Sequence, residues 1–267
     1  MVVSDSHAVV WHDLECGCYT ADLPLWRELA GATTTITGTD DAERDASAGA
    51  PPSAVLDVGA GSGRVTLDLA RAGHGVTALD LDAELLQALR ERAAGMRVDT
   101  VCADARTFEL DRRDFALCVA PMQTVQLLGG PVGRLEFLRR ARAHLRPGGA
   151  LVCAIATEIE PFDCDAGDVG PSPEIARVGG TTYISRATRV RVGRRVVRIE
   201  RERAVLAGED PAAQEQPAWV RDVVELDRVS VGQLQREGRE AGLTEAGTRA
   251  IPATEEHTAS VAVMFRA

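Results

Sequence analysis

Between residues 54 and 157, short apolar segments alternate with segments of helical periodicity, and this alternation constrains the fold more than any other feature. The intervening segments predict helices over 63–72, 83–94 and 133–144. Because a helix that joins two parallel strands must cross over the sheet, the alternation predicts a doubly wound parallel sheet that is covered on both faces. The predicted strands span 54–58, 75–79, 97–102, 115–120 and 150–156.

The charge balance and composition exclude several classes of function. The formal net charge is −10, which disfavours a surface that binds a nucleic-acid backbone. All 30 basic residues are arginine, and the lack of lysine excludes a lysine Schiff base and a Walker A phosphate loop. No apolar run reaches about 18 residues, so neither a transmembrane helix nor a membrane partner is expected.

The cysteines predict neither a metal site nor a disulfide framework. They are scattered at positions 16, 18, 102, 118, 153 and 164. Cys16 and Cys18 stand too close together for a zinc knuckle, and no second pair completes four ligands. The first residues also lack the basic and apolar pattern of a signal peptide. We therefore expect a reduced, cytoplasmic compartment.

Composition and periodicity divide the chain into four parts, residues 1–53, 54–157, 158–230 and 231–267. The first part contains an amphipathic helix at 22–30 and a polar connector from Gly38 to Pro52. The third begins with a Pro/Gly/Asp-rich loop at 158–180 and continues as a β-hairpin with one further strand. The fourth predicts a helix capped by Ser230 and two closing strands. The strands of the third part span 181–192, 195–206 and 218–229. In the fourth part the helix spans 231–241 and the closing strands span 243–251 and 260–265.

The first predicted strand leads into a glycine-rich turn, Val55-Leu-Asp-Val-Gly-Ala-Gly-Ser-Gly63. Its glycines permit a tight turn and a close ligand approach, and the helix amides beyond it favour a carboxylate or phosphate. The dinucleotide fingerprint G-x-G-x-x-G is absent in every frame. At later strand ends, Asp80 suits the ribose hydroxyls of an adenosine, and Asp104, beside Ala105, suits the adenine amino group. All three signals fall on the sheet edge where open α/β sheets bind ligands.

Together these motifs resemble the signature of class I S-adenosylmethionine-dependent methyltransferases. The matching segments are Asp57-Val-Gly-Ala-Gly-Ser-Gly63, Leu79-Asp80, Ala103-Asp104-Ala105 and Leu145-Arg-Pro-Gly-Gly149. The resemblance implies a Rossmann-like, doubly wound sheet of seven strands, whose antiparallel last strand lies in the closing segments at 243–265. The part at 54–157 would then be the cofactor-binding core.

The resemblance also implies S-adenosylmethionine as the cofactor and a role for each motif. The glycine turn would line its methionine end, Asp57 would hold its ammonium, and Ala120 would lie near its sulfonium. Asp80 would hold the ribose, while Asp104 and Ala105 would hold the adenine. The cofactor-binding residues expected are Tyr19, Asp57, Gly59, Ala60, Gly61, Gly63, Asp80, Leu81, Asp104, Ala105 and Ala120.

The flanking segments resemble the glycine and amino-sugar N-methyltransferases within that family. Residues 11–24 resemble their N-terminal lid, whose aromatic would be Tyr19, and the hairpin region resembles their small antiparallel β insertion after the fifth strand. Two positions depart from the pattern. Trp11 stands where many relatives have tyrosine, and Gln126 fills the position where several amino-sugar relatives have histidine.

The candidate catalytic residues are Gln123, Gln126 and His257. The two glutamines could orient an acceptor or form a polar pair at a helix start, and His257 could reach the site or lie on a surface loop. A neutral amine acceptor needs only desolvation and a proton exit, whereas a hydroxyl acceptor needs a base worth about 10²–10⁴-fold. His12, Asp13 and Glu158 are further candidates, with ordinary packing or solvation as the alternative.

The sequence therefore predicts a methyltransferase that acts on a nitrogen or oxygen atom of a small molecule in secondary metabolism. Two alternatives stay open: a non-methylating reaction such as cyclisation in the same fold, and a non-catalytic binding protein. The Arg-rich hairpin could hold an anionic substrate, but its alternation with valine and isoleucine favours a solvated face, which is also a plausible contact for a homodimer. The acidic loop at 158–168 could attract a cation or bind a metal, but we expect it to be solvated.

Overall fold

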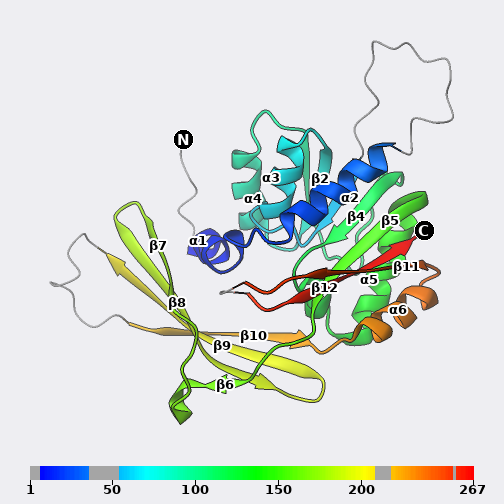
Figure 1. Ribbon diagram of the computed structural model, residues 1–267. Helices are drawn as coiled ribbons and strands as arrows, with labels where there is room; N and C mark the ends of the chain where they lie inside the picture. The colour runs from blue at the N-terminus through cyan, green and yellow to red at the C-terminus, as the bar shows by residue number, and fades with distance from the viewer. Residues whose placement is uncertain (1–6, 36–53, 208–217, 255–256) are drawn as a thin grey trace.

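The computed structural model describes residues 7–35, 54–207, 218–254 and 257–267 (Figure 1). The polar connector expected at 38–52 lies outside the described residues. Two sheets organise the rest: a seven-stranded sheet flanked by helices, and a five-stranded antiparallel sheet that extends away from it (Figure 1). The expected fold class, a Rossmann-like seven-stranded sheet with an antiparallel insertion after the fifth strand, is confirmed.

The seven-stranded sheet has the order β11-β12-β5-β4-β1-β2-β3. Strands β1 to β5 run parallel, and β12 is antiparallel to both of its neighbours. The strand order reverses between β1 and β4, and at such a switch point the carboxyl ends of the strands open a crevice for ligands. The strands are β1 (Ala54–Val58), β2 (Gly75–Asp80), β3 (Val98–Cys102), β4 (Phe115–Ala120), β5 (Leu145–Ala156), β11 (Thr244–Ile251) and β12 (Ser260–Arg266).

Helices cover both faces of this sheet, which is why β1 and β4 are buried along their whole length. On one face, Phe137 of α5 and Leu234 of α6 belong to a single apolar cluster. On the other, Trp26 of α2 packs in a cluster with Leu69 of α3, and α4 contacts β2 and β3. The helices are α1 (His7–His12), α2 (Leu23–Thr35), α3 (Arg64–Arg71), α4 (Ala83–Arg92), α5 (Gly130–His144) and α6 (Val231–Glu240), with a π-helical turn η1 (Asp13–Gly17) and 3₁₀ turns η3 (Thr124–Leu127) and η4 (Cys164–Ala166).

The five-stranded sheet has the order β10-β9-β8-β6, and β7 also pairs with β8. Its centre is the expected hairpin, in which β8 and β9 are joined at Gly193. Its strands are β6 (Phe162–Asp163), β7 (Glu174–Val178), β8 (Thr181–Val192), β9 (Val196–Ala207) and β10 (Val220–Asp227). Two of them, β6 and β7, lie in the segment at 158–180 that the sequence predicts as a loop.

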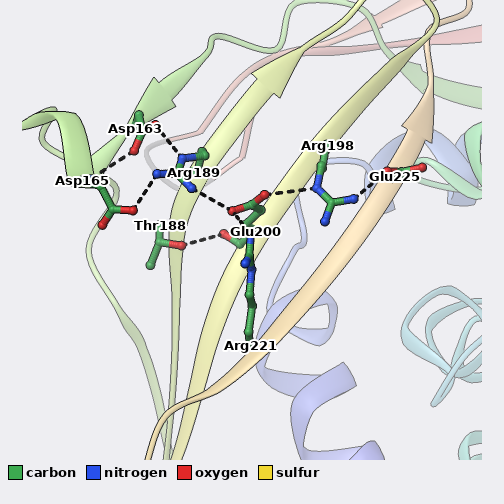
Figure 2. Close-up of polar contacts among 8 residues, drawn as sticks. All are labelled: Asp163, Asp165, Thr188, Arg189, Arg198, Glu200, Arg221 and Glu225. Carbon is green, nitrogen blue, oxygen red and sulfur yellow. Dashed lines mark hydrogen bonds and ion pairs between the residues drawn. The ribbon is translucent and has the colours of Figure 1, made fainter.

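The expectation of a solvated face holds for Arg186, Arg191, Arg194 and Arg195, which are exposed, but other arginines of this hairpin are half-buried and pair with carboxylates. Glu200 of β9 is only 3% exposed because cationic side chains surround it (Figure 2). Its ion-pair partners are Arg189, Arg198 and Arg221. Arg189 also pairs with Asp163 and Asp165, so part of the acidic loop belongs to the same network. The alternation that predicted solvated arginines could not show which carboxylate lies across the strand.

The fifth strand begins earlier than expected. The Pro-Gly-Gly segment predicts a helix stop followed by a strand at 150, yet β5 starts at Leu145, directly after α5. His144 is fully buried at this junction, where its Nε2 accepts a hydrogen bond from the amide of Leu110. Gly148 and Gly149 exchange backbone hydrogen bonds with Ala267 at the end of the chain. These bonds draw the glycines into the sheet edge.

Candidate functional site

The turn from β1 to α3 passes through three glycines in a backbone conformation that other residues rarely adopt. The φ angle is +74° at Gly59, +54° at Gly61 and +102° at Gly63. A Cβ atom on Gly61 would collide with the ring of His12, and one on Gly63 would collide with Leu89 of α4. Glycine is therefore needed here both for the shape of the turn and for the close approach of its neighbours.

A cavity of about 490 Å³ lies beside this turn, at the carboxyl ends of β1 to β4. The predicted residues that line it are Asp57, Gly59, Ala60, Asp80, Leu81, Asp104, Ala105 and Gln123. Ala120 is fully buried, and Pro121 and Met122, which follow it, reach the cavity instead. Met122 has a φ of +52°, a strained conformation for a residue with a side chain, and such strain gathers at functional sites.

Asp57 is a fully buried carboxylate with one unused oxygen. Its Oδ2 accepts a hydrogen bond from Thr66 Oγ1 at 2.6 Å, whereas its Oδ1 has no partner among the described residues. Burial raises the pKa of Asp57 to about 6, against the lowering effect of the Thr66 hydrogen bond and of Arg64. An unsatisfied buried acceptor at a cavity wall indicates a site for a ligand that donates hydrogen bonds or carries positive charge.

Asp80 and Asp104 stand at the ends of β2 and β3, as expected. The carboxylate of Asp80 accepts hydrogen bonds from the amides of Gly61 at 2.8 Å and Asp82 at 2.9 Å, so it fixes the glycine turn to the second strand. Asp104 pairs with Arg106, and this hydrogen-bonded guanidinium holds the pKa of the Asp104 carboxyl below its usual value. Both carboxylates keep acceptor capacity toward the cavity they line.

The N-terminal segment α1–η1 packs directly on the glycine turn. His12 lines the cavity, and its Nδ1 lies 3.0 Å from Ser62 Oγ. The Ser62 hydroxyl donates to Asp13, whose carboxylate forms a two-bond ion pair with Arg92 of α4. Burial lowers the pKa of His12 despite the nearby charges of Asp13 and Asp80. His12 therefore belongs to the cavity wall.

The same segment also contacts the five-stranded sheet. Glu15 accepts hydrogen bonds from Ser185 of β8 and from Arg203 of β9. Cys16 lines the cavity, and burial raises its thiol pKa to about 11. Neighbouring residues of η1 thus contact the glycine turn, the insertion and the cavity, and rare π-helical turns are frequent at functional sites.

Tyr19 and His257 lie together but do not line the cavity. Their ring centroids are 4.5 Å apart, and the guanidinium carbon of Arg64 lies 5.1 Å from the centre of the Tyr19 ring. Tyr19 is only 5% exposed and packs in the apolar cluster of Trp26. Arg64, which the sequence analysis did not single out, lines the cavity, although it directly follows the last glycine of the turn.

Gln126 is placed away from the cavity, and its amide is fully engaged. Its Nε2 donates to the carbonyls of Ala156 and Asp227, and its Oε1 accepts from the amide of Ala156 at 2.8 Å. The residue is 1% exposed, and it ties η3 to the ends of β5 and β10. Gln126 therefore joins the insertion to the core.

The comparisons with known proteins agree with this geometry. Residues 55–149 match a family model described as a methyltransferase domain. The chain has the class I methyltransferase fold. A curated relative, the probable cobalt-precorrin-6B C(15)-methyltransferase (decarboxylating) of Methanothermobacter thermautotrophicus, is 32% identical over 117 residues, which cover 41% of this chain and 57% of the relative. The chain thus spans little more than half the length of that curated relative.

Two solved structures share the methyltransferase fold over almost the whole chain. The amino pentose methyltransferase from Micromonospora echinaspora involved in calicheamicin biosynthesis has a TM-score of 0.64 at 21% identity, covering 95% of this chain and 96% of its own. The sugar N-methyltransferase from Streptoalloteichus sp has a TM-score of 0.68 at 14% identity, covering 98% and 94%. At these identities the likeness establishes the fold of the insertion as well as that of the core.

Two further observations concern the described part of the chain. Within the described ranges, no three or more His, Cys, Asp and Glu side chains gather as a metal site would require. No helix of the described part combines the length and the apolar character needed to cross a membrane.

Replacing Gln126 with alanine is expected to lower stability by about 1–3 kcal/mol, because it leaves buried backbone groups unsatisfied. For a chain of this size that corresponds to a fall in Tm of about 2–12 °C in thermal unfolding. Gln123→Ala is the matched control, since Gln123 is half-buried and makes no capping bond. A Gln126→Ala variant that unfolds like the wild type but loses activity would instead identify a catalytic role.

Proposed function

We propose that the protein transfers a methyl group from S-adenosylmethionine to a nitrogen or oxygen atom of a small molecule. The observation that carries the proposal is the unpartnered, buried Oδ1 of Asp57 in the cavity of a methyltransferase domain. A cavity of about 490 Å³ also suits a ligand of this size.

The residues that line the cavity fit this cofactor. Asp57 offers its unused oxygen and its charge to the ammonium of the methionine end. Asp80 offers carboxylate acceptors to the ribose, and Asp104 with the backbone of Ala105 offers partners to the adenine. Leu81 is 71% exposed at the rim, and an apolar ring that covered it would remove this side chain from water.

In this proposal the protein supplies positioning more than proton chemistry. Bound S-adenosylmethionine would supply a methyl group that its sulfonium has already activated. The residues of the cavity would align the donor with the acceptor and exclude water, an effect that can contribute on the order of 7–11 kcal/mol. A nitrogen acceptor needs only an exit for its proton. Gln123, which lines the cavity, is proposed to contact the acceptor, whereas His257 packs on Tyr19 outside the cavity wall and its contact with the acceptor stays a prediction. An oxygen acceptor would need a base as well.

The wider setting is also a proposal. One structural neighbour is involved in calicheamicin biosynthesis, and this likeness supports a role for the present protein in secondary metabolism. The six free cysteines support a reducing, cytoplasmic compartment. A homodimer through the hairpin stays a prediction, which analytical ultracentrifugation of the purified protein can test.

Two measurements test the proposed function. Isothermal titration calorimetry with S-adenosylhomocysteine should give a binding signal, and radiolabelled methyl groups should pass from S-adenosylmethionine into a pool of small amines and alcohols. Consumption of the acceptor without transfer of label would favour a non-methylating reaction such as cyclisation. Binding without any chemistry would favour a non-catalytic protein, and no binding would contradict the proposal.

Binding of S-adenosylhomocysteine is expected to strengthen about tenfold as the pH rises from about 5 to about 7. Burial raises the pKa of Asp57 to about 6, so its carboxylate is mostly protonated at the lower pH, and only the ionised form attracts the ligand's ammonium. Between its ordinary pKa of 3.8 and the raised pKa of about 6, the folded chain keeps a proton on Asp57 that the unfolded chain has lost, so this group's contribution to stability falls as the pH rises through that range. Asp57→Asn should flatten the dependence in calorimetric titrations, whereas an unchanged slope would assign it to His12.

A further inference from the structure

The ring of His12 occupies a defined position between Ser62 and Gly61. Its Nδ1 faces Ser62 Oγ at 3.0 Å, and its Nε2–Cε1 edge lies against Gly61, where a Cβ atom would collide with it. The amide of Gly61 donates to the carboxylate of Asp80 at 2.8 Å. His12, Gly61 and Asp80 are therefore contiguous, and both His12 and Asp80 line the cavity.

The hydrogen-bond inventory around Ser62 fixes which ring nitrogen carries the proton. Asp13 forms an ion pair with Arg92 through both carboxylate oxygens, so it can only accept. The single hydroxyl proton of Ser62 is donated to Asp13 Oδ1 at 2.5 Å. Ser62 Oγ must then accept from His12, so Nδ1 carries the proton and the neutral ring keeps a lone pair on Nε2.

The lone pair on Nε2 can accept a hydrogen bond, and a ligand in the cavity beside Asp80 can supply the donor. The two oxygens of Asp80 already accept one backbone amide each, so each keeps limited capacity for a ligand. A ribose carries two adjacent hydroxyl donors. A diol bound there is matched by two acceptors, the carboxylate of Asp80 and the imidazole of His12.

We propose that Nε2 of His12 accepts a hydrogen bond from a ribose hydroxyl of S-adenosylmethionine, and that Ser62 acts as a positioning residue that sets the required tautomer. The inference rests on the proposed function, because it assigns a contact to the same cofactor. It also gives the N-terminal segment a direct part in binding, since His12 reaches the ligand while Asp13 fastens the segment to α4.

The tautomer can be tested without any ligand. Nitrogen chemical shifts of the histidine rings in the purified wild-type protein should contain at least two neutral rings protonated at Nδ1, those of His12 and His144, because Nε2 of His144 accepts from the amide of Leu110. Of these two signals, only that of His12 should vanish in His12→Asn. In Ser62→Ala the ring loses its acceptor, and the His12 signal should move toward the Nε2-protonated form. A wild-type His12 signal that is already Nε2-protonated would overturn the inference.

The contact itself can be tested with matched variants and matched ligands. In His12→Asn the side-chain amide can still donate to Ser62 but offers no acceptor at the Nε2 position, whereas His12→Gln extends an acceptor toward it. By calorimetry, His12→Asn should bind S-adenosylhomocysteine about 5- to 50-fold more weakly, and His12→Gln should recover part of the loss. Ser62→Ala should weaken binding in the wild type but add little in His12→Asn.

Truncated ligands identify the group that donates. The loss in His12→Asn should be equally large for 5′-methylthioadenosine, which keeps the ribose but lacks the amino-acid part, and should vanish for its 2′,3′-dideoxy form. A loss confined to S-adenosylhomocysteine would place the bond at the amino group and contradict the ribose contact, as would no loss with either ligand. If the wild type binds neither ligand, the proposed function fails. The tautomer measurement would still show which ring nitrogen of His12 is protonated.

Discussion

Replacing Asp80 with alanine is expected to weaken the binding of S-adenosylhomocysteine by at least about 100-fold. The carboxylate makes two hydrogen bonds to backbone amides, at Gly61 and Asp82, and bonds to a charged group contribute about 1.5–3 kcal/mol each. The substitution removes the ribose acceptor and releases the glycine turn from β2 in one step. Calorimetric titration measures the loss, and Asp80→Asn, which keeps one acceptor without the charge, should give an intermediate value.

Asp82→Ala is the matched control for this experiment. Asp82 caps α4 through the amides of Glu84 and Leu85, so its loss should cost about 1 kcal/mol of stability. It does not line the cavity, and its removal should leave the affinity within about threefold. The assignment of Asp80 is contradicted if Asp80→Ala binds nearly as well as the wild type, or if Asp82→Ala weakens binding to the same degree.

The core of the fold could be predicted because its signals are local. Parallel strands buried on both faces are continuous apolar runs, and β1 and β4 occupy the predicted ranges without any shift. The glycine turn and the acids at the ends of β2 and β3 could be found for the same reason, since a short stretch of sequence contains both the strand end and the polar residue. Their convergence then follows from topology alone.

The parts that could not be predicted depend on contacts between distant segments. Gln126 has an ordinary polar side chain in the sequence, and its burial follows from carbonyls at Ala156 and Asp227, far along the chain. The contact of His12 with Ser62 likewise joins residues separated by 50 positions. In the hairpin, the pairing of Glu200 with three arginines depends on strand register and on a bulge that periodicity does not reveal (Figure 2).

Another contact between distant segments, that of Arg134 with Glu237, predicts the largest loss of stability. Arg134 of α5 is 1% exposed and holds Glu237 of α6 with two bonds of 2.8 Å, and its Nη1 also reaches Asp227 at the end of β10. Replacing Arg134 with methionine should destabilise the chain by about 3–5 kcal/mol, because two partly buried carboxylates then lose their cation. Thermal unfolding should show a fall in Tm of about 6–20 °C.

The chain contains its own control for this prediction. Arg139 and Glu240 join the same two helices across 3.8 Å, but both side chains are more than half exposed, so Arg139→Met should cost no more than about 1 kcal/mol. Adding Glu237→Met to Arg134→Met should recover part of the loss, since a buried apolar pair removes the unpaired charge that makes the single variant unstable. Equal costs for Arg134→Met and Arg139→Met would contradict this account, because Arg134 is buried and hydrogen-bonded to two carboxylates whereas Arg139 is exposed and more distant from its one partner. The consequence reaches beyond the helices, since Arg134 and Gln126 both bind the end of β10 and so hold the insertion sheet to the core.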